Sequence, residues 1–414
     1  MRGRFSRKRF LYLTAGVAAA SAATGCGGEQ GAGQGRAASR QGENAGQSET
    51  AAQGAEAPAQ EGGLTRAEQG QAVYGENSYI SPLAEIFGDV FVGQGVFVAS
   101  NTVLRAAPEQ TLEIGDRTSV QDNCVLRAIE ESSAIRDETS IAHHAIVRDS
   151  EIGDFVFLGF NTEVRNSRVG NGAFVNHGAR VENVELAENA FVDLGQVITT
   201  QEQTDDLPTA ETATEEFRRE VLDVNAEFAE GYVRLFEEEG YRAAIDVGPQ
   251  PATSFNPDPI EPQIPEDVTL GEFARIVGDV RLGPGSRVGQ RAAIRADEGA
   301  PIVIGAGSDI RNRVTFQALK GTRIQIGDAL FAGDDAVIHG PLEMGNGVQV
   351  GDRSVVFRVI VEDGVDIGEG ALVVGPASED GELTLTIPAG TVIPDGTIIT
   401  GQEQLDELEQ LRLP

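Results

Sequence analysis

The chain has 414 residues and a formal net charge of −33 at pH 7, from 65 acidic and 32 basic residues. So acidic a surface repels a phosphate backbone, which excludes nucleic acid as a partner. The two cysteines are too few for a disulfide framework or a cysteine-rich metal site, so packing alone must hold the fold.

The N-terminus predicts export and a lipid anchor. Residues 1–25 carry basic residues, then an apolar run too short to span a bilayer, then small residues, which is the order of a secretory signal peptide. The ATGC that ends at Cys26 resembles a lipobox, with Ala23 where leucine is usual. We therefore expect Cys26 to be lipidated and the protein to lie on the outer side of the cytoplasmic membrane or at the cell surface. Residues 26–72 are mostly Gly, Gln, Ala, Ser and Glu, have little to bury, and are predicted to form a disordered tether.

Residues 73–205 carry aliphatic residues six positions apart in runs of three, such as Val92, Val98 and Leu104. Neither an α-helix, with a period of about 3.6, nor a strand, with a period of about 2, produces this spacing. A parallel β-helix built from hexapeptides does, because each run of three marks one triangular coil whose branched side chains fill the interior.

An amphipathic α-helix is predicted within residues 206–245, where apolar residues follow helical spacing. These residues are Phe217, Val221, Val224, Phe228, Tyr232 and Leu235. Residues 246–268 are proline-rich and are predicted to be an extended linker.

Residues 269–404 repeat the pattern, and 405–414 are left as a C-terminal tail. The halves also match in detail, since IFGDV at Ile86 corresponds to IVGDV at Ile276. Likewise, VITTQEQ at Val197 corresponds to IITGQEQ at Ile398. The chain is therefore predicted to be a tandem duplication.

Several phrases, spread over nearly all of residues 73–404, resemble the gamma-class carbonic anhydrases. They are YISP at Tyr79, SVQDNCVL at Ser119, SIAHHAIV at Ser140, VNAEFAEGY at Val224, IRADEGAPIVIG at Ile294 and VIHGP at Val337. The resemblance implies an all-β fold of two tandem left-handed parallel β-helices with an amphipathic α-helix between them. It also implies a zinc ion held by three histidines between neighbouring β-helices of a trimer, and reversible hydration of carbon dioxide. For this chain we expect a homo-oligomer or a pseudo-oligomeric packing of the two halves.

Neither half keeps the three histidines that the resemblance implies as zinc ligands. The matching positions hold Arg127, His143 and Arg148 in the first half, and Gln317, Asp334 and His339 in the second. An arginine offers a fixed cation in place of a lone pair. The losses are complementary across an interface between the halves, where His143, His339 and Gln317 would form a composite site for zinc or another divalent metal. The remaining three residues are expected to gather elsewhere.

Other positions match family residues near the metal. The candidate catalytic residues are Glu298, Glu130, Gln121 and Asn225, and the residues expected to tie subunits together are Arg105, Arg295 and Asp297. His144 and His177 match no ligand position, and we interpret them as ordinary histidines.

Two functions follow from the sequence. If metal is bound, its water becomes hydroxide near neutral pH and attacks carbon dioxide, and bicarbonate leaves, with Glu298 or Glu130 moving protons. If metal is absent, the same fold is a scaffold or binding protein that has lost the chemistry. A hexapeptide acyltransferase is disfavoured, because no phrase supports a site for a nucleotide-linked acyl donor. The sequence thus predicts an exported, gamma carbonic anhydrase-like lipoprotein and leaves open whether it is an enzyme.

Overall fold

The computed structural model describes residues 63–75, 77–378 and 381–411. The predicted signal peptide, Cys26 and the tether up to residue 62 lie outside the described residues. Thr65–Arg66, which the sequence assigned to the tether, form strand β1 and pair antiparallel with β5 (Asp89–Val92). In the part of the chain that the structure describes, no helix is long and apolar enough to cross a membrane.

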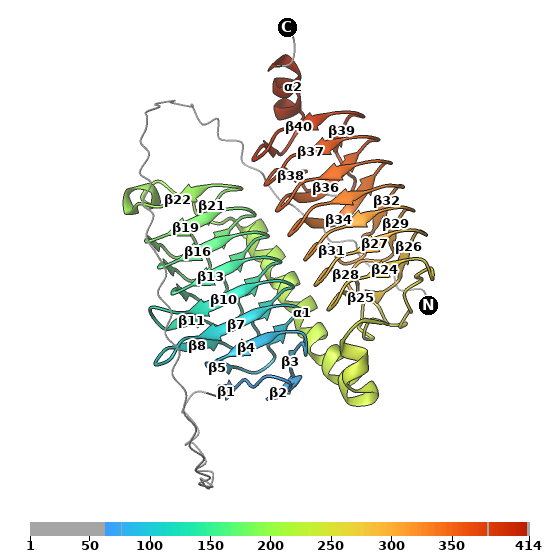
Figure 1. Ribbon diagram of the computed structural model, residues 1–414. Coiled ribbons are helices and arrows are strands. Elements are labelled where there is room, and N and C mark those ends of the chain that lie inside the picture. The colour runs from blue at the N-terminus through green and yellow to red at the C-terminus, as the bar shows by residue number, and fades with distance from the viewer. Residues whose placement is uncertain (1–62, 76, 379–380, 412–414) are drawn as a thin grey trace, which may run out of the picture. The chain divides into compact units, whose positions relative to one another are not determined.

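The first β-helix has three sheets, because successive coils each add a short strand to each face (Figure 1). One sheet consists of β1, β5, β8 (Thr111–Ile114), β11 (Ser133–Ile135), β14 (Glu151–Ile152), β17 (Arg168–Val169) and β20 (Glu185–Leu186). The second, called here the β10 sheet, consists of β4 (Glu85–Phe87), β7 (Val103–Ala106), β10 (Val125–Ala128), β13 (Ile146–Arg148), β16 (Glu163–Arg165), β19 (Arg180–Glu182) and β22 (Val197–Ile198). The third, called the α1 sheet, consists of β2 (Val73–Tyr74), β3 (Ser78–Ile80), β6 (Phe97–Val98), β9 (Ser119–Val120), β12 (Ser140–Ile141), β15 (Phe157–Leu158), β18 (Phe174–Val175) and β21 (Phe191–Val192).

The second β-helix is built in the same way. Two of its faces merge into one sheet, because β34 (Val337–Met344) and β36 (Val355–Val361) run on from one face to the next. That sheet also holds β23 (Val247–Gly248), β25 (Arg275–Gly278), β26 (Val280–Leu282), β28 (Ala293–Ala296), β29 (Ile302–Ile304), β31 (Thr315–Ala318), β32 (Ile324–Ile326), β38 (Leu372–Val374), β39 (Leu385–Ile387) and β41 (Ile398–Ile399). The remaining face holds β24 (Thr269–Leu270), β27 (Arg287–Val288), β30 (Asp309–Ile310), β33 (Phe331–Ala332), β35 (Gln349–Val350), β37 (Asp366–Ile367) and β40 (Val392–Ile393).

The residues of the six-residue period fill the interior of each coil. Leu104, Leu126 and Val147 stand in register on successive strands of the β10 sheet, and each is fully buried. Each half encloses its own apolar core of this kind. The predicted fold class, two tandem β-helices of hexapeptides, is confirmed.

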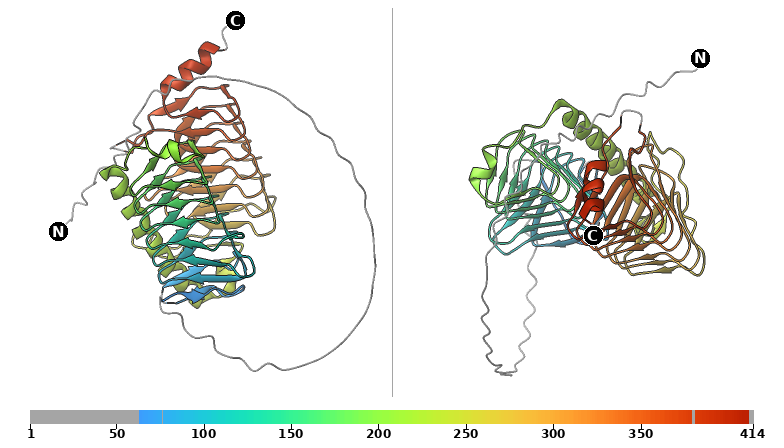
Figure 2. Two further views of the ribbon diagram at one scale, coloured as in Figure 1. Left: turned by 90° about the vertical axis from the view of Figure 1, so that its left-hand side faces the viewer. Right: turned by 90° about the horizontal axis from the view of Figure 1, so that it is seen from above.

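Helix α1 (Thr212–Glu239), which begins and ends inside the predicted range, covers the α1 sheet (Figure 2). Its Phe228 and Tyr232 pack against Tyr79 and Phe97 of that sheet, with ring centroids 5.2 to 5.6 Å apart. Two short 3-10 helices, Gln201–Thr204 and Tyr241–Ala244, precede and follow α1 along the chain. Because α1 packs on this sheet, some of its polar groups lie close to the site described below.

Two predicted boundaries are shifted in the structure. In the proline-rich linker, β23 pairs in parallel with β25 and so extends the second β-helix backward. The predicted tail lies largely in α2 (Gln402–Leu411), and Leu405 of this helix is buried against the second core. Both segments end a stack of coils whose apolar interior would otherwise be open to water.

The halves meet along one corner of the first β-helix, formed by the turns between its α1 sheet and its β10 sheet. Asn101, Asn123 and Asn161 in these turns have φ of 60°, 60° and 54°, a left-handed conformation that asparagine tolerates. Their side-chain amides donate to the backbone carbonyls of Arg291, Arg313 and Arg353, over 3.2, 3.4 and 2.8 Å respectively. The acceptors occupy the matching turns of the second half, so the two β-helices lie coil against coil.

Candidate functional site

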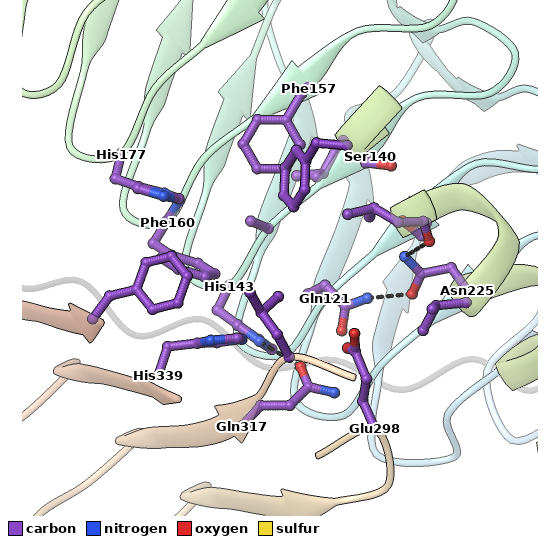
Figure 3. Close-up of a pocket in the computed structure, with 18 residues that line it drawn as sticks. Gln121, Ser140, His143, Phe157, Phe160, His177, Asn225, Glu298, Gln317 and His339 are labelled. Atoms are coloured by element: carbon purple, nitrogen blue, oxygen red, sulfur yellow. Dashed lines mark hydrogen bonds between the residues drawn. The ribbon is translucent and has the colours of Figure 1, made fainter. Parts of the chain in front are cut away.

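A pocket of about 60 Å³ lies where the corner of the first β-helix, the strands of the second and α1 come together. The side chains of His143, His339 and Gln317 point toward one another in it, as Figure 3 shows. The apolar part of its wall is made by Ile141, Ala142, Phe157, Phe160, Phe217, Val221, Val224, Leu319 and Phe357. A cavity of this size holds only water or a small molecule.

The three candidate metal ligands come from both halves of the chain. Gln317 of β31 and His339 of β34 are register partners on adjacent strands, and His143 reaches them from the first-half corner. Nε2 of His143 lies 2.8 Å from Oε1 of Gln317, and the ring centroids of His143 and His339 are 5.9 Å apart. Nδ1 of His339 donates a hydrogen bond of 2.9 Å to the backbone carbonyl of Gly340, which leaves Nε2 unprotonated in the neutral ring. Burial lowers the pKa of His339 well below its usual value, so this ring is neutral.

Arg295 joins the two halves beside these residues. Its Nε and Nη1 lie 2.9 Å from the carboxylates of Asp122, in the first half, and Asp297, in the second. All three side chains are almost completely buried. Burial would raise the pKa of Asp122, but the Arg295 guanidinium outweighs it and lowers that pKa.

The contacts close into a ring. The other oxygen of Asp297 accepts a hydrogen bond of 2.9 Å from the amide of Gln317, whose oxygen faces His143. Nδ1 of His143 in turn lies 3.4 Å from Asp122, which completes the circuit through Arg295. Because a carboxylate only accepts hydrogen bonds, Asp297 fixes which way the Gln317 amide points.

Helix α1 is tied to this ring by two of its polar residues. Tyr232 donates a hydrogen bond of 2.8 Å to Asp297. Arg295 donates to Gln121 over 2.7 Å, and Gln121 donates to Asn225 over 2.6 Å. Two of the candidate catalytic residues, Gln121 and Asn225, thus lie in the pocket and are held in a structural network.

Glu298 also lines the pocket. Its Oε1 accepts a hydrogen bond of 2.8 Å from the backbone amide of Lys320. Burial raises the pKa of Glu298 to about 8, so this carboxyl is largely protonated at neutral pH and can donate a proton or a hydrogen bond.

Other predicted site residues lie elsewhere. Glu130 is 71% exposed and pairs with Arg148 on the outer surface of the first half, away from the pocket lining. Arg105 lies on the exposed face of the β10 sheet and does not tie the halves together. Within one chain, Arg127, Arg148 and Asp334 do not come together, and Arg148 pairs with Asp149 and Glu130. The physical reason is that the first-half corner meets the second-half strands, whereas the cluster needs the reverse pairing.

The sequence missed an aromatic column beside the histidines. His177, interpreted as an ordinary histidine, lines the pocket and stacks on Phe160 with centroids 4.3 Å apart, and Phe160 stacks on His339 at 4.9 Å. Burial lowers the pKa of His177 to about 3, and its Nδ1 accepts the backbone amide of Phe160. The spacing could have revealed the column, since His143, Phe160 and His177 are 17 positions apart, one coil each. His144 instead contacts Thr315 over 2.9 Å, across the interface.

The donor set does not fit a zinc site of the kind that the resemblance implies. Zinc in a catalytic site takes three strong protein ligands and an open position. Here the third position holds a neutral amide, which is already bonded to His143 and Asp297. Across the described ranges, no group of three or more His, Cys, Asp or Glu side chains is placed to hold a metal ion.

Comparisons with known proteins find carboxysome assembly proteins and a carbonic anhydrase among the relatives of this chain. The carboxysome assembly protein CcmM of Nostoc sp. is 31% identical over 173 residues, 39% of this chain and 29% of the relative. CcmM of Synechococcus elongatus is 35% identical over 162 residues, 37% of this chain and 28% of the relative. The carbonic anhydrase of Methanosarcina thermophila is 27% identical over 180 residues, 39% of this chain and 69% of the relative. The match thus spans less than a third of each carboxysome protein.

No protein-family model matches the chain. Among solved structures, a hexapeptide transferase family protein from Anaplasma phagocytophilum is 21% identical, with a TM-score of 0.26. The match covers 37% of this chain and 87% of that one.

The raised pKa of Glu298 predicts a pH-dependent stability. Between its ordinary value of 4.5 and about 8, the folded state binds more protons at Glu298 than the unfolded state does, so stability falls as pH rises through this window. Glu298→Gln keeps the acceptor for Lys320 and removes the titration. We expect wild type and variant to melt within a degree or so of each other at pH ~5, and the variant to melt several degrees higher at pH ~9. Equal melting temperatures at both pH values, measured by circular dichroism, would show that Glu298 titrates normally.

Proposed function

This chain is a gamma carbonic anhydrase-like left-handed β-helix protein, and we propose that it works as a scaffold or binding protein without a catalytic metal. The observation that carries the proposal is the position of Gln317, hydrogen-bonded to His143 and Asp297 where the family resemblance implies a third imidazole. The rival function is reversible hydration of carbon dioxide at a composite zinc site of His143, His339 and Gln317.

The hydrogen-bond directions argue for the scaffold. Because Asp297 holds the nitrogen of the Gln317 amide, the amide oxygen faces His143, and the hydrogen bond between them needs a proton on Nε2. Nδ1 of the same ring faces the Asp122 carboxylate. With that proton in place, the nitrogen that faces Gln317 offers no lone pair to a metal.

Metal binding would also disturb the contacts of the buried ring. The ring holds two carboxylates, Asp122 and Asp297, and one guanidinium, Arg295. A divalent cation could bind only if His143 released its Nε2 proton and Gln317 released its hydrogen bond to His143. That hydrogen bond helps to join the two halves.

The names of two relatives support a structural role for this β-helix fold. Two of the matching proteins are named carboxysome assembly proteins, and their matching segments align with this chain. The carbonic anhydrase match supports common ancestry of the site, in which His143 and His339 are inherited ligand positions.

Replacing Gln317 tests the assignment. In Gln317→His, the introduced imidazole can donate to Asp297 through one nitrogen and present the other to the pocket beside His143 and His339. We expect the variant to bind Co²⁺ at least about tenfold more tightly than wild type, with the visible absorption bands of a tetrahedral site, because it supplies three imidazoles. Gln317→Asn, which keeps an amide, is the matched control and should behave as wild type.

Wild type loaded with Zn²⁺ or Co²⁺ should hydrate carbon dioxide no faster than buffer in a stopped-flow assay. Stoichiometric metal in wild type together with hydration above the buffer rate would overturn the scaffold proposal and favour the composite enzyme.

We also propose that the protein is exported and anchored by a lipid on Cys26, as the signal-like N-terminus and ATGC suggest. In a bacterial host, Cys26→Ala should move the protein from the membrane fraction to the soluble exported fraction, because the acyl chains supply the membrane affinity. Cys124→Ala is the control, since Cys124 is buried in the first core and cannot be lipidated. A Cys26→Ala protein that remained wholly with the membrane in fractionation would rule the anchor out.

A further inference from the structure

Two serines interrupt an aromatic column on the α1 sheet. The outward residues of its successive strands stand in register in the order Tyr79, Phe97, Ser119, Ser140, Phe157, Phe174 and Phe191. Helix α1 packs its own aromatic rings on this column to both sides of the serines, Phe228 on Phe97 and Phe217 on Phe157, with ring centroids 5.6 and 5.2 Å apart. Because a serine side chain is much smaller than a phenyl ring, the column leaves space under the helix at these two strands.

The helix does not fill this space. Val221, Val224 and Asn225 of α1 line the same pocket as the two serines (Figure 3). Asn225 is held back, because its amide donates a hydrogen bond of 2.8 Å to the carbonyl of Val221 in its own helix. The pocket volume of about 60 Å³ is roughly twice the space that a water molecule takes in the liquid, so it suits a ligand of about two to four non-hydrogen atoms.

Both serine hydroxyls are buried without a hydrogen bond. Ser119 and Ser140 are 1% and 3% exposed, and neither Oγ has a partner among the described residues. A buried polar group without a partner costs free energy and is rare in native proteins. The two serines are register partners on adjacent strands, which lie about 4.8 Å apart, so one small polar group can reach both hydroxyls. The pair therefore points to a ligand that supplies the missing hydrogen bonds.

The rest of the lining favours a neutral ligand. Within the described part of the chain, no Lys or Arg lines the pocket, and Glu298 is the only Asp or Glu that does. Burial raises the pKa of Glu298 to about 8 and lowers the pKa values of His177 and His339, so these groups are largely uncharged at neutral pH. A charged ligand would lose its hydration and gain no counter-charge. A hydroxyl group matches the serines, because it both donates and accepts hydrogen bonds.

We propose that this pocket binds a short-chain aliphatic alcohol, with its hydroxyl group between Ser119 and Ser140 and its hydrocarbon part against Phe157 and Val224. The ligand hydroxyl accepts a hydrogen bond from one serine and donates one to the other. The inference rests on the binding role proposed above and assigns a ligand class to it. It requires neither a metal nor a second protein.

Three small molecules of similar size test the ligand class: 2-propanol is neutral, acetate is negative and isopropylammonium is positive. The sample is the full-length chain carrying Cys26→Ala, in EDTA at pH ~7. In a saturation-transfer NMR titration, we expect 2-propanol to bind saturably with a millimolar dissociation constant, because so few atoms contact the protein. Acetate and isopropylammonium should bind at least about tenfold more weakly, because the pocket offers them no counter-charge.

Serine variants locate the site. Ser119→Ala and Ser140→Ala should each weaken 2-propanol binding about fivefold, and Ser140→Leu, which fills the space, should abolish it. Ser308→Ala is the matched control, because Ser308 is also buried but lies in the second half, outside the pocket lining. Without alcohol, both pocket alanine variants should melt no lower than wild type, since each loses only an unpartnered hydroxyl. Serines that merely supported the fold would give the opposite result, a lower melting temperature.

Three results would overturn the proposal: no saturable binding of 2-propanol, charged probes that bind as tightly, or a Ser119→Ala, Ser140→Ala double variant that binds as wild type does. Each of them would leave the scaffold assignment standing, because that assignment depends on the metal content of wild type and of Gln317→His. Conversely, metal in wild type would remove the scaffold assignment without changing a titration done in EDTA.

Discussion

The arrangement of the molecule depends on one buried guanidinium. Arg295 has almost no contact with water, and its pKa is raised because Asp122 and Asp297 outweigh the effect of burial, which would lower it. Through Asp122 it holds the first β-helix, and through Gln121 and Asn225 it holds α1. A buried charge with one partner removed is strongly destabilising, so these elements are constrained to one relative position.

That constraint also decides the chemistry of the pocket. Asp297 binds Arg295 with one oxygen and Gln317 with the other, so the amide that replaces a histidine is part of the joint between the halves. The residue that would have to release its hydrogen bonds to admit a metal is thus one that the fold uses. His339 and His177, whose pKa values are lowered by burial, stack around Phe160 and line the pocket beside this joint. The interface between the halves keeps one histidine from each of them, His143 and His339.

Much of the fold could be predicted, because a period of six has few physical explanations. Leu104, Leu126 and Val147 are inward residues, as their spacing predicts. The meeting of His143 with Gln317 and His339 followed from the resemblance, since each half lacked what the other kept. The direct bond between His143 and Gln317 could not be read from the sequence, because it depends on how Asp297 orients an amide. Glu130 was misplaced for a similar reason: its match to a family position said nothing of the arginine, Arg148, that holds it at the surface.

The most direct test of the account is anomalous diffraction at the zinc edge from crystals grown with excess zinc. The account predicts no anomalous peak between His143 and His339, with the Gln317 amide still in hydrogen-bond contact with His143. A peak at about 2.0–2.1 Å from nitrogens of both imidazoles, with the amide turned away from His143, would contradict it.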